Sequence, residues 1–137
     1  MDFLDTNVLV YAVSRRADDL AKAEAARRLI QLGGQFISLQ VLQEFYRVAV
    51  HPRKLNYTHD EVVILCEGWR KCFTVLEPTL TLFDESLAIC ARYQISYFDA
   101  CILAAAKQLG CSTVYSEDLN DGQTYDGLRV VNPFIGL

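Results

Sequence analysis

The sequence has few histidines and no paired cysteines, and both absences narrow the chemistry open to it. Only two of the 137 residues are histidines, His51 and His59, and they lie apart in sequence. The five cysteines include no Cys-x-x-Cys pair, so we expect no zinc site. Their odd number leaves at least one unpaired, and most lie in apolar helical stretches, as reduced cysteines do.

Long apolar runs and an excess of basic residues are also lacking. No run approaches the roughly 18 residues of a membrane span, so we expect no membrane segment. The first residues include acids at positions 2 and 5 and no basic leader, which favours a cytoplasmic location over secretion. Thirteen basic and 17 acidic residues give a net charge of −4, which does not by itself favour nucleic-acid binding.

The overall composition is that of a globular protein. Apolar residues make up 52% of the chain and charged residues 22%. We find no internal repeat, low-complexity tract or linker, and therefore expect one domain over residues 1–137. A chain of this length buries enough surface to fold without a disulfide or a metal.

Hydrophobic periodicity predicts five short strands separated by longer helices. The strands are expected at residues 3–4, 36–37, 73–76, 112–115 and 128–131. The helices are expected at residues 8–13, 18–32, 38–50, 58–72, 79–93 and 96–109. This alternation predicts an α/β domain whose largely parallel sheet is covered on both faces.

Acidic residues lie where ligands bind such sheets, beyond the carboxyl ends of the strands. Asp5 follows the first predicted strand, and Asp118 and Asp121 follow the fourth. Glu44 lies about two turns into the helix after the second strand, and Asp99 lies in the first turn of the 96–109 helix. If that helix starts at the same edge, these hard oxygen donors converge and suit Mg²⁺ or Mn²⁺. Two such ions promote phosphodiester cleavage by water.

Each acid also has a purely structural interpretation. Asp5 could cap the first helix, and Asp99 could be the acid of the capping box that opens the 96–109 helix. Glu44 could be a solvated helix acid, although it borders an apolar stripe. Asp118 and Asp121 lie in a turn-like stretch, where aspartate is common. Only their joint arrangement favours a metal site.

Four segments, in this order, resemble a known family. They are residues 3–9 (FLDTNVL), 41–45 (VLQEF), 97–103 (YFDACIL) and 114–122 (VYSEDLNDG), followed by a similar tail at 131–134 (VNPF). Together they cover essentially the whole chain. The chain resembles a PIN domain, and most closely the VapC-type ribonuclease toxins of toxin–antitoxin pairs.

The resemblance implies a three-layer α/β/α sandwich with a five-stranded, mostly parallel sheet. It also implies an endoribonuclease dependent on Mg²⁺ or Mn²⁺, whose catalytic and metal-binding acids are Asp5, Glu44, Asp99 and Asp118. Many members follow the fourth acid segment with an Asp and an aromatic residue, whereas Gly122 follows Asp121 here. Asp121 therefore remains a candidate metal ligand beside Asp118, which we favour because it is nearer the strand end.

The resemblance also implies an RNA substrate (tRNA is one candidate), a homodimer and a small antitoxin that blocks the site. Apolar helix surface within residues 55–66 is a candidate contact for the second copy or the antitoxin. Thr6 and Ser116 are expected to hold carboxylates or metal-bound water, and Asn7 to cap a helix.

Local basic clusters suggest how RNA could approach an acidic site. Arg15, Arg16 and Arg47 are candidate phosphate contacts, with ordinary solvated helix charges as the alternative. Tyr11 and the aromatic residues at positions 46 and 98 are candidates for base stacking, although a core role is the more usual one.

Other functions remain open at this stage. A non-catalytic PIN-like scaffold that binds RNA or protein is the main alternative, although no expected acid is missing. A receiver-like signalling domain would need a lysine after a late strand, where this chain has Ser-Glu-Asp at 116–118. Metal-dependent cleavage of DNA is chemically possible as well.

Overall fold

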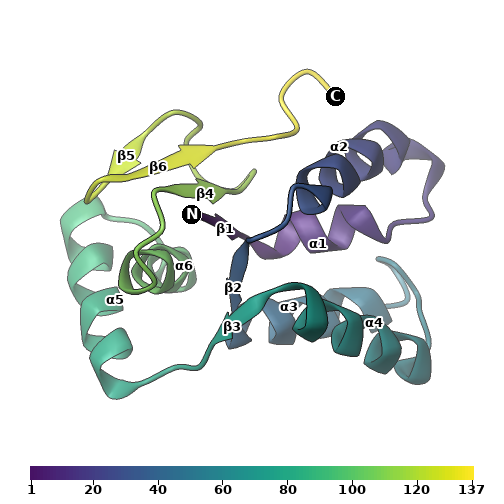
Figure 1. Cartoon of the computed structure of the whole chain (residues 1–137), viewed down its shortest axis with the longest axis horizontal. Coiled ribbons are helices and arrows are strands. Elements are labelled where there is room, and N and C mark those ends of the chain that lie inside the picture. Colours follow the sequence, from purple (N-terminus) through teal and green to yellow (C-terminus); the bar gives the residue numbers. More distant parts are fainter.

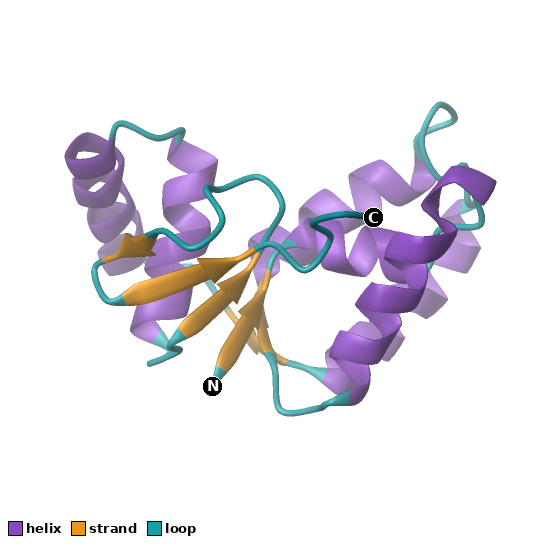
Figure 2. Ribbon diagram, turned by 90° about the horizontal axis from the view of Figure 1, so that it is seen from above, coloured by secondary structure: helices purple, strands orange, loops and turns teal.

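The computed structural model describes residues 1–137 and contains a six-stranded sheet between two groups of helices (Figures 1 and 2). The strands are β1 (Asp2–Leu4), β2 (Phe36–Ser38), β3 (Thr74–Leu76), β4 (Thr113–Tyr115), β5 (Thr124–Tyr125) and β6 (Leu128–Val131). Their order in the sheet is β3-β2-β1-β4-β6-β5, and every neighbouring pair is parallel except β5 with β6. The predicted α/β class with a mostly parallel sheet is confirmed.

The helices divide between the two faces of the sheet. They are α1 (Thr6–Ala12), the 3₁₀ turn η1 (Ala17–Asp19), α2 (Leu20–Gln31), α3 (Leu39–Val50), α4 (His59–Cys72), α5 (Leu80–Tyr93) and α6 (Tyr97–Gln108). Helices α5 and α6 pack together on one side of the strands, and α1 to α4 lie on the other (Figures 1 and 2). The predicted α/β/α layering is therefore confirmed.

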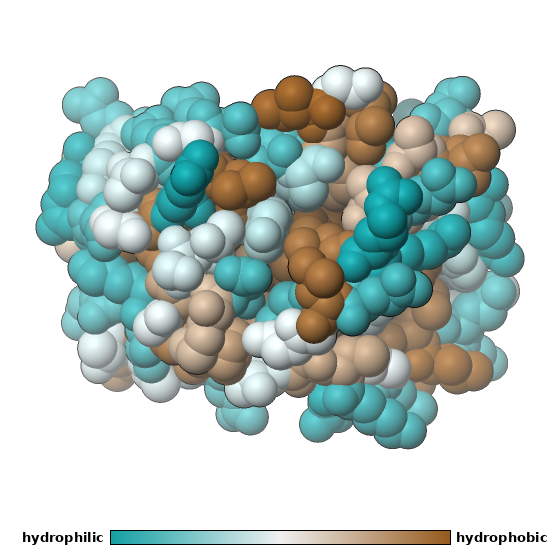
Figure 3. Space-filling model, turned by 45° about the horizontal axis from the view of Figure 1, so that its top comes forward, coloured by the Kyte–Doolittle hydropathy of each residue, from teal (hydrophilic) through white to brown (hydrophobic).

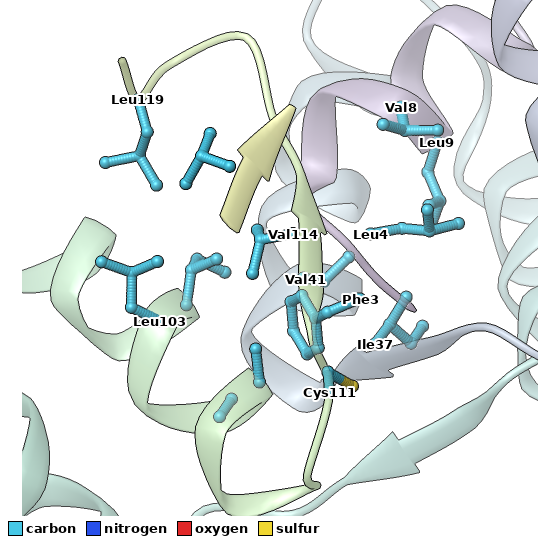
Figure 4. Close-up of a cluster of buried hydrophobic side chains, with 14 of the residues drawn as sticks. Phe3, Leu4, Val8, Leu9, Ile37, Val41, Leu103, Cys111, Val114 and Leu119 are labelled. Carbon is cyan, nitrogen blue, oxygen red and sulfur yellow. The ribbon is translucent and has the colours of Figure 1, made fainter. Parts of the chain in front are cut away.

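The core lies on both faces of the central strands. Phe3 and Leu4 are fully buried neighbours on β1, and successive strand side chains point to opposite faces. Figure 4 shows Leu4 close to Val8 and Leu9 of α1, while Leu103 of α6 lies on the other side of β4. This double burial explains why the central strand β1 carries two consecutive apolar residues, Phe3 and Leu4.

The prediction of five strands was wrong because the loop after β4 contains a hairpin. Strand β5 pairs antiparallel with β6 across Asp126 and Gly127, both of which have left-handed backbones with φ of 50° and 86°. A two-residue turn of this kind favours Asp-Gly, because most other residues resist positive φ. Residues 116–127 are mostly polar, so the hydrophobic pattern gave no strand there, and the Asp126-Gly127 pair was the one signal of the hairpin.

Helix capping follows the sequence in part. Thr58 and Glu61, spaced as in a capping box, form a complete box at the start of α4, and the side chain of each accepts the other's backbone N–H. At α6 only one of the two bonds of the capping box forms, in which the Ser96 hydroxyl accepts the N–H of Asp99. The Asp99 carboxylate is therefore not a capping group. Ser38 stands at the start of α3 and has a residue type that favours helix capping, but its hydroxyl forms no capping bond and no other hydrogen bond.

The surface combines hydrophilic side chains with separate apolar patches (Figure 3). Of the residues expected to form an apolar contact on α4, Val62 is fully buried, while Val63 and Ile64 are exposed. All five cysteines are free. None of the helices has the length and apolar character that crossing a membrane requires.

The hairpin turn is fixed to the α5–α6 pair by one carboxylate. Asp126 accepts hydrogen bonds from the Tyr93 hydroxyl and from the side chains of Arg92 and Lys107. The Tyr93 hydrogen bond, with help from the two cations, lowers the pKa of Asp126 to about 2. Its stabilising effect is therefore present above the unfolded pKa of about 4 and is lost as the pH falls towards 2.

We predict that Asp126→Asn lowers the free energy of unfolding by about 1–3 kcal/mol at pH 7, because the charged hydrogen bonds are lost while asparagine still tolerates positive φ. Urea unfolding should show the gap between wild type and variant closing between pH 4 and pH 2. A gap that is the same at both pH values would contradict this role.

Candidate metal centre

The ends of β1 and β4 bring two polar residues side by side. The Asp5 N–H donates to the Tyr115 carbonyl and the Ser116 N–H donates to the Val131 carbonyl, each at 3.0 Å, so the sheet hydrogen bonding continues past both strands. The Ser116 hydroxyl then donates to Asp5 Oδ2 at 2.7 Å. The sheet itself therefore sets the position of the Asp5 carboxylate.

Asp5 is a buried acid with no basic partner. Its side chain accepts the Thr6 N–H at 2.7 Å, so it caps α1 as the structural interpretation expected. Only 3% of the residue is exposed, and this burial raises its pKa to about 7. The bonds from Ser116 and Thr6 oppose the shift, while the charges of Asp118 and Glu44 add to it. Capping alone does not explain an acid with this pKa.

Glu44 reaches the same region from α3. The Thr6 hydroxyl donates to its Oε2 at 2.8 Å, and the Gln40 amide, one turn earlier on α3, donates to its Oε1 at 2.9 Å. The residue is half-buried, so it is not the freely solvated helix acid of the alternative interpretation. Two neutral groups hold this carboxylate in place.

Asp99 faces the other acids from the first turn of α6. Partial burial raises its pKa, the Ser96 side chain opposes that shift, and the charges of Asp118 and Glu44 add to the increase. These three carboxylates are thus close enough to sense one another electrostatically. The start of α6 therefore lies near the edge where β1 and β4 end, which was the condition for these acids to converge.

The structure separates the two candidates for the fourth acid. The Asp118 N–H donates to Ser116 Oγ at 3.1 Å, and the Asn7 amide donates to Asp118 Oδ2 at 3.2 Å. Asp121 lies farther along the loop, where its carboxylate accepts the Asn132 N–H at 2.8 Å. Among these acids, the charge of Asp118 and not that of Asp121 raises the pKa of Asp5 and Asp99.

No cation neutralises these four carboxylates. The four salt bridges of the chain join other residues: Arg15–Glu61, Lys22–Glu117, Arg92–Asp126 and Lys107–Asp126. As they stand, no three acidic, histidine or cysteine side chains form a group that could hold a metal ion. Hydroxyl and amide donors occupy oxygens of Asp5, Glu44 and Asp118. The donor chemistry nevertheless fits a hard divalent cation, because four unpaired carboxylates in mutual repulsion lack only positive charge.

A cleft of about 430 Å³ opens beside the acids and carries basic residues on its walls. Thr6, Glu44 and Asp118 line it together with Arg16, Arg47 and Lys54. Arg15 does not line the cleft. Its guanidinium lies 3.9 Å from the centre of the Tyr57 ring and 3.8 Å from Glu61. The structure therefore brings two of the three predicted arginines to the acids.

Sequence reasoning missed several residues that shape this region. Asn7, expected to cap a helix, instead links α1 to the loop after β4, since its oxygen also accepts the Glu117 N–H at 3.4 Å. Lys22 and Tyr11 hold the Glu117 side chain, with the Tyr11 hydroxyl donating to it at 2.8 Å. Residues that contact each other across about 110 positions, such as Asn7 and Glu117, leave no local pattern in the sequence. The contact between Gln40 and Glu44 could have been found, because residues four apart share one face of a helix.

We predict that Asp5→Asn stabilises the fold at high pH in the presence of a chelator. An aspartate whose folded pKa is about 7 gives full stability below its unfolded pKa of about 4 and loses it as the pH rises through 7. Urea unfolding should find the variant more stable than wild type by about 2–4 kcal/mol at pH 8, with the difference shrinking towards pH 5. The control is Asp84→Asn, at an exposed site on α5. A difference that does not change between pH 5 and pH 8 would show that Asp5 is not the titrating group.

Comparison with known proteins places this geometry in a family. A family model of the PIN domain matches residues 3–122. Curated protein sequences gave no match to the chain.

Solved structures share the fold at low identity. A toxin–antitoxin complex from Klebsiella pneumoniae matches with a TM-score of 0.72 at 20% identity, covering 98% of each chain. The VapC20 toxin of Mycobacterium tuberculosis, described as cleaving the sarcin–ricin loop, matches with a TM-score of 0.69 at 18% identity, covering 94% of this chain and 99% of that one. A DNA-bound VapBC from Salmonella typhimurium matches with a TM-score of 0.67 at 21% identity, covering 94% and 95%. With most of its length matched by the family model and its fold shared with these structures, the chain belongs to the PIN domain family.

Proposed function

We propose that this chain is a metal-dependent endoribonuclease and the toxin of a VapBC-type toxin–antitoxin pair. The observation that carries the proposal is the set of four carboxylates, Asp5, Glu44, Asp99 and Asp118, gathered at one sheet edge without a cation. Such a set is costly in a folded protein unless positive charge arrives from outside. The fold shared with an RNA-cleaving toxin supports RNA as the substrate.

In this proposal the same four acids hold Mg²⁺ or Mn²⁺. Bound there, a divalent cation would activate water for attack on a phosphodiester and stabilise the leaving oxygen. Asp121 is not assigned to the set, because its carboxylate is directed to the backbone of Asn132.

The remaining residues of the site orient these acids and the substrate. Ser116 and Thr6 hold the buried carboxylate of Asp5, and the Thr6 hydroxyl also fixes Glu44. Arg16, Arg47 and Lys54 have no acidic partner in the chain and bind phosphates of the RNA on either side of the bond to be cut. The chemistry needs no histidine as a base.

The biological setting follows from the relatives. Structures of toxin–antitoxin complexes share this fold, so a small antitoxin is the proposed partner, blocking the carboxylate edge. A homodimer and a cytoplasmic location complete the proposal. The apolar residues exposed on α4, Val63 and Ile64, are the candidate contacts with the antitoxin or the second copy.

A non-catalytic PIN scaffold is the second candidate. It is favoured by the finding that no three of the acids already form a metal-binding group. On that view the hydroxyl and amide donors around the carboxylates are sufficient, and the cleft binds RNA or protein without cutting it.

The deciding experiment is RNA cleavage by the purified chain with Mg²⁺, with Mn²⁺ and with a chelator. We expect cleavage of total RNA or of a full tRNA set only with metal, reduced at least about 100-fold in Asp5→Asn and Asp99→Asn. Raising the salt concentration should weaken the activity, because phosphate contacts depend on ionic strength.

The fourth acid has a matched pair of variants in one loop. Asp118→Asn should lose activity like Asp5→Asn, whereas Asp121→Asn should retain it. Activity that persists in Asp5→Asn and Asp99→Asn would point to a contaminant and overturn the site. A folded, metal-binding protein that cuts no RNA would establish the scaffold.

A further inference from the structure

A second hollow shares Glu44 and Arg47 with the basic cleft. It encloses about 240 Å³ and is lined by Gln40, Gln43, Glu44, Arg47 and Phe98. We call this group the Phe98 shelf. Glu44 and Arg47 line both hollows, so the shelf is continuous with the cleft beside the acids.

Phe98 is an unusual residue for this position. It immediately precedes the candidate metal ligand Asp99, and 64% of its surface is exposed. Its ring has an edge-on contact with Tyr97, with centroids 5.3 Å apart. The expectation of a core role for this aromatic residue was wrong. An exposed ring beside an acid cluster is a platform for another planar group.

The other shelf residues can recognise the edge of such a group. Gln40 uses its amide nitrogen on Glu44 and on the Phe98 carbonyl, at 2.9 and 3.1 Å, which leaves its oxygen free to accept. Gln43 is exposed and its amide is tied to no other side chain. Arg47 adds an unpaired positive charge at the rim. An aromatic face, amide edges and a cation together are the chemistry that recognises an unpaired base and its phosphate.

We propose that the Phe98 shelf binds one unpaired nucleobase of the RNA next to the bond that is cut. The base stacks on Phe98, and Gln40 and Gln43 contact its edge. At about 240 Å³ the hollow is smaller than the 300–1,000 Å³ usual for whole ligands, which suits a single ring system. The inference rests on the proposed function and adds to it a binding site for one base, formed by residues of α3 and α6 beside the acids.

The test measures binding of a labelled short single-stranded RNA by fluorescence anisotropy in the Asp5→Asn background, so that cleavage does not interfere. Adding Phe98→Ala should weaken binding at least about fivefold, and Phe98→Trp should restore it, because base stacking tolerates a change of aromatic ring. Binding of the same strand as a duplex should change by less than about twofold in Phe98→Ala.

The control is Tyr46→Ala on α3, an exposed aromatic whose ring contacts His59 and lines neither the shelf nor the basic cleft. It should leave single-strand binding unchanged. Equal single-strand binding by wild-type and Phe98→Ala proteins would overturn the shelf while leaving metal-dependent cleavage intact. Binding that depends on Phe98 in a protein that never cuts RNA would instead keep the shelf and refute the nuclease.

A second copy of the chain is the rival occupant, because Leu80 and Phe83 are exposed near the same end of the α5–α6 pair. Light scattering of wild type, Phe98→Ala and Leu80→Glu decides between them. If Leu80→Glu changes the molecular mass and loses as much RNA affinity as Phe98→Ala, the effect comes from self-association and the proposal fails. If Leu80→Glu binds single-stranded RNA normally, the base site stands.

Discussion

The buried carboxylate of Asp5 is the constraint around which the rest of the site is arranged. Strand β1 lies in the middle of the sheet, so the residue that follows it enters the interior whatever its charge. Burial is the main cause that raises the pKa of this acid to about 7, and the charges of Asp118 and Glu44 contribute to the same shift. A hydrophobic side chain would stabilise the fold more, and the acid there is a cost that the proposed cation would remove.

The chain separates its charges instead of neutralising them. Neutral donors from Thr6, Ser116, Gln40 and Asn7 hold the acids in place. Its salt bridges join other residues. Lys22, for example, pairs with Glu117, the acid next to Asp118, and so neutralises a charge beside the cluster. The net charge of −4 therefore says little about the proposed RNA binding, because the basic residues near the acids, Arg16, Arg47 and Lys54, line a single cleft.

The sequence predicted the parts of this arrangement that follow from strand ends and helix starts. Asp5, Glu44 and Asp99 each stand at a defined distance from such an end, so the parallel-sheet rule located them. The choice between Asp118 and Asp121 depended on how a loop folds, and it is the Ser116 and Asn7 contacts that favour Asp118. Strand β5 was not predicted, although the Asp126-Gly127 pair of its turn is a known hairpin signal in the sequence. The exposure of Phe98 could not be foreseen, because an apolar residue on an apolar helix normally faces the core.

The central claim is that a cation binds where Asp5 would otherwise retain a proton. Isothermal titration of Mn²⁺ into the protein, in buffers of different ionisation enthalpy, counts the protons released on binding. At pH 6 the account predicts release of close to one proton by wild type, little release at pH 8.5, and clearly less release from Asp5→Asn than from wild type. Binding of Mn²⁺ at pH 6 without proton release, or with the same release from Asp5→Asn, would contradict it.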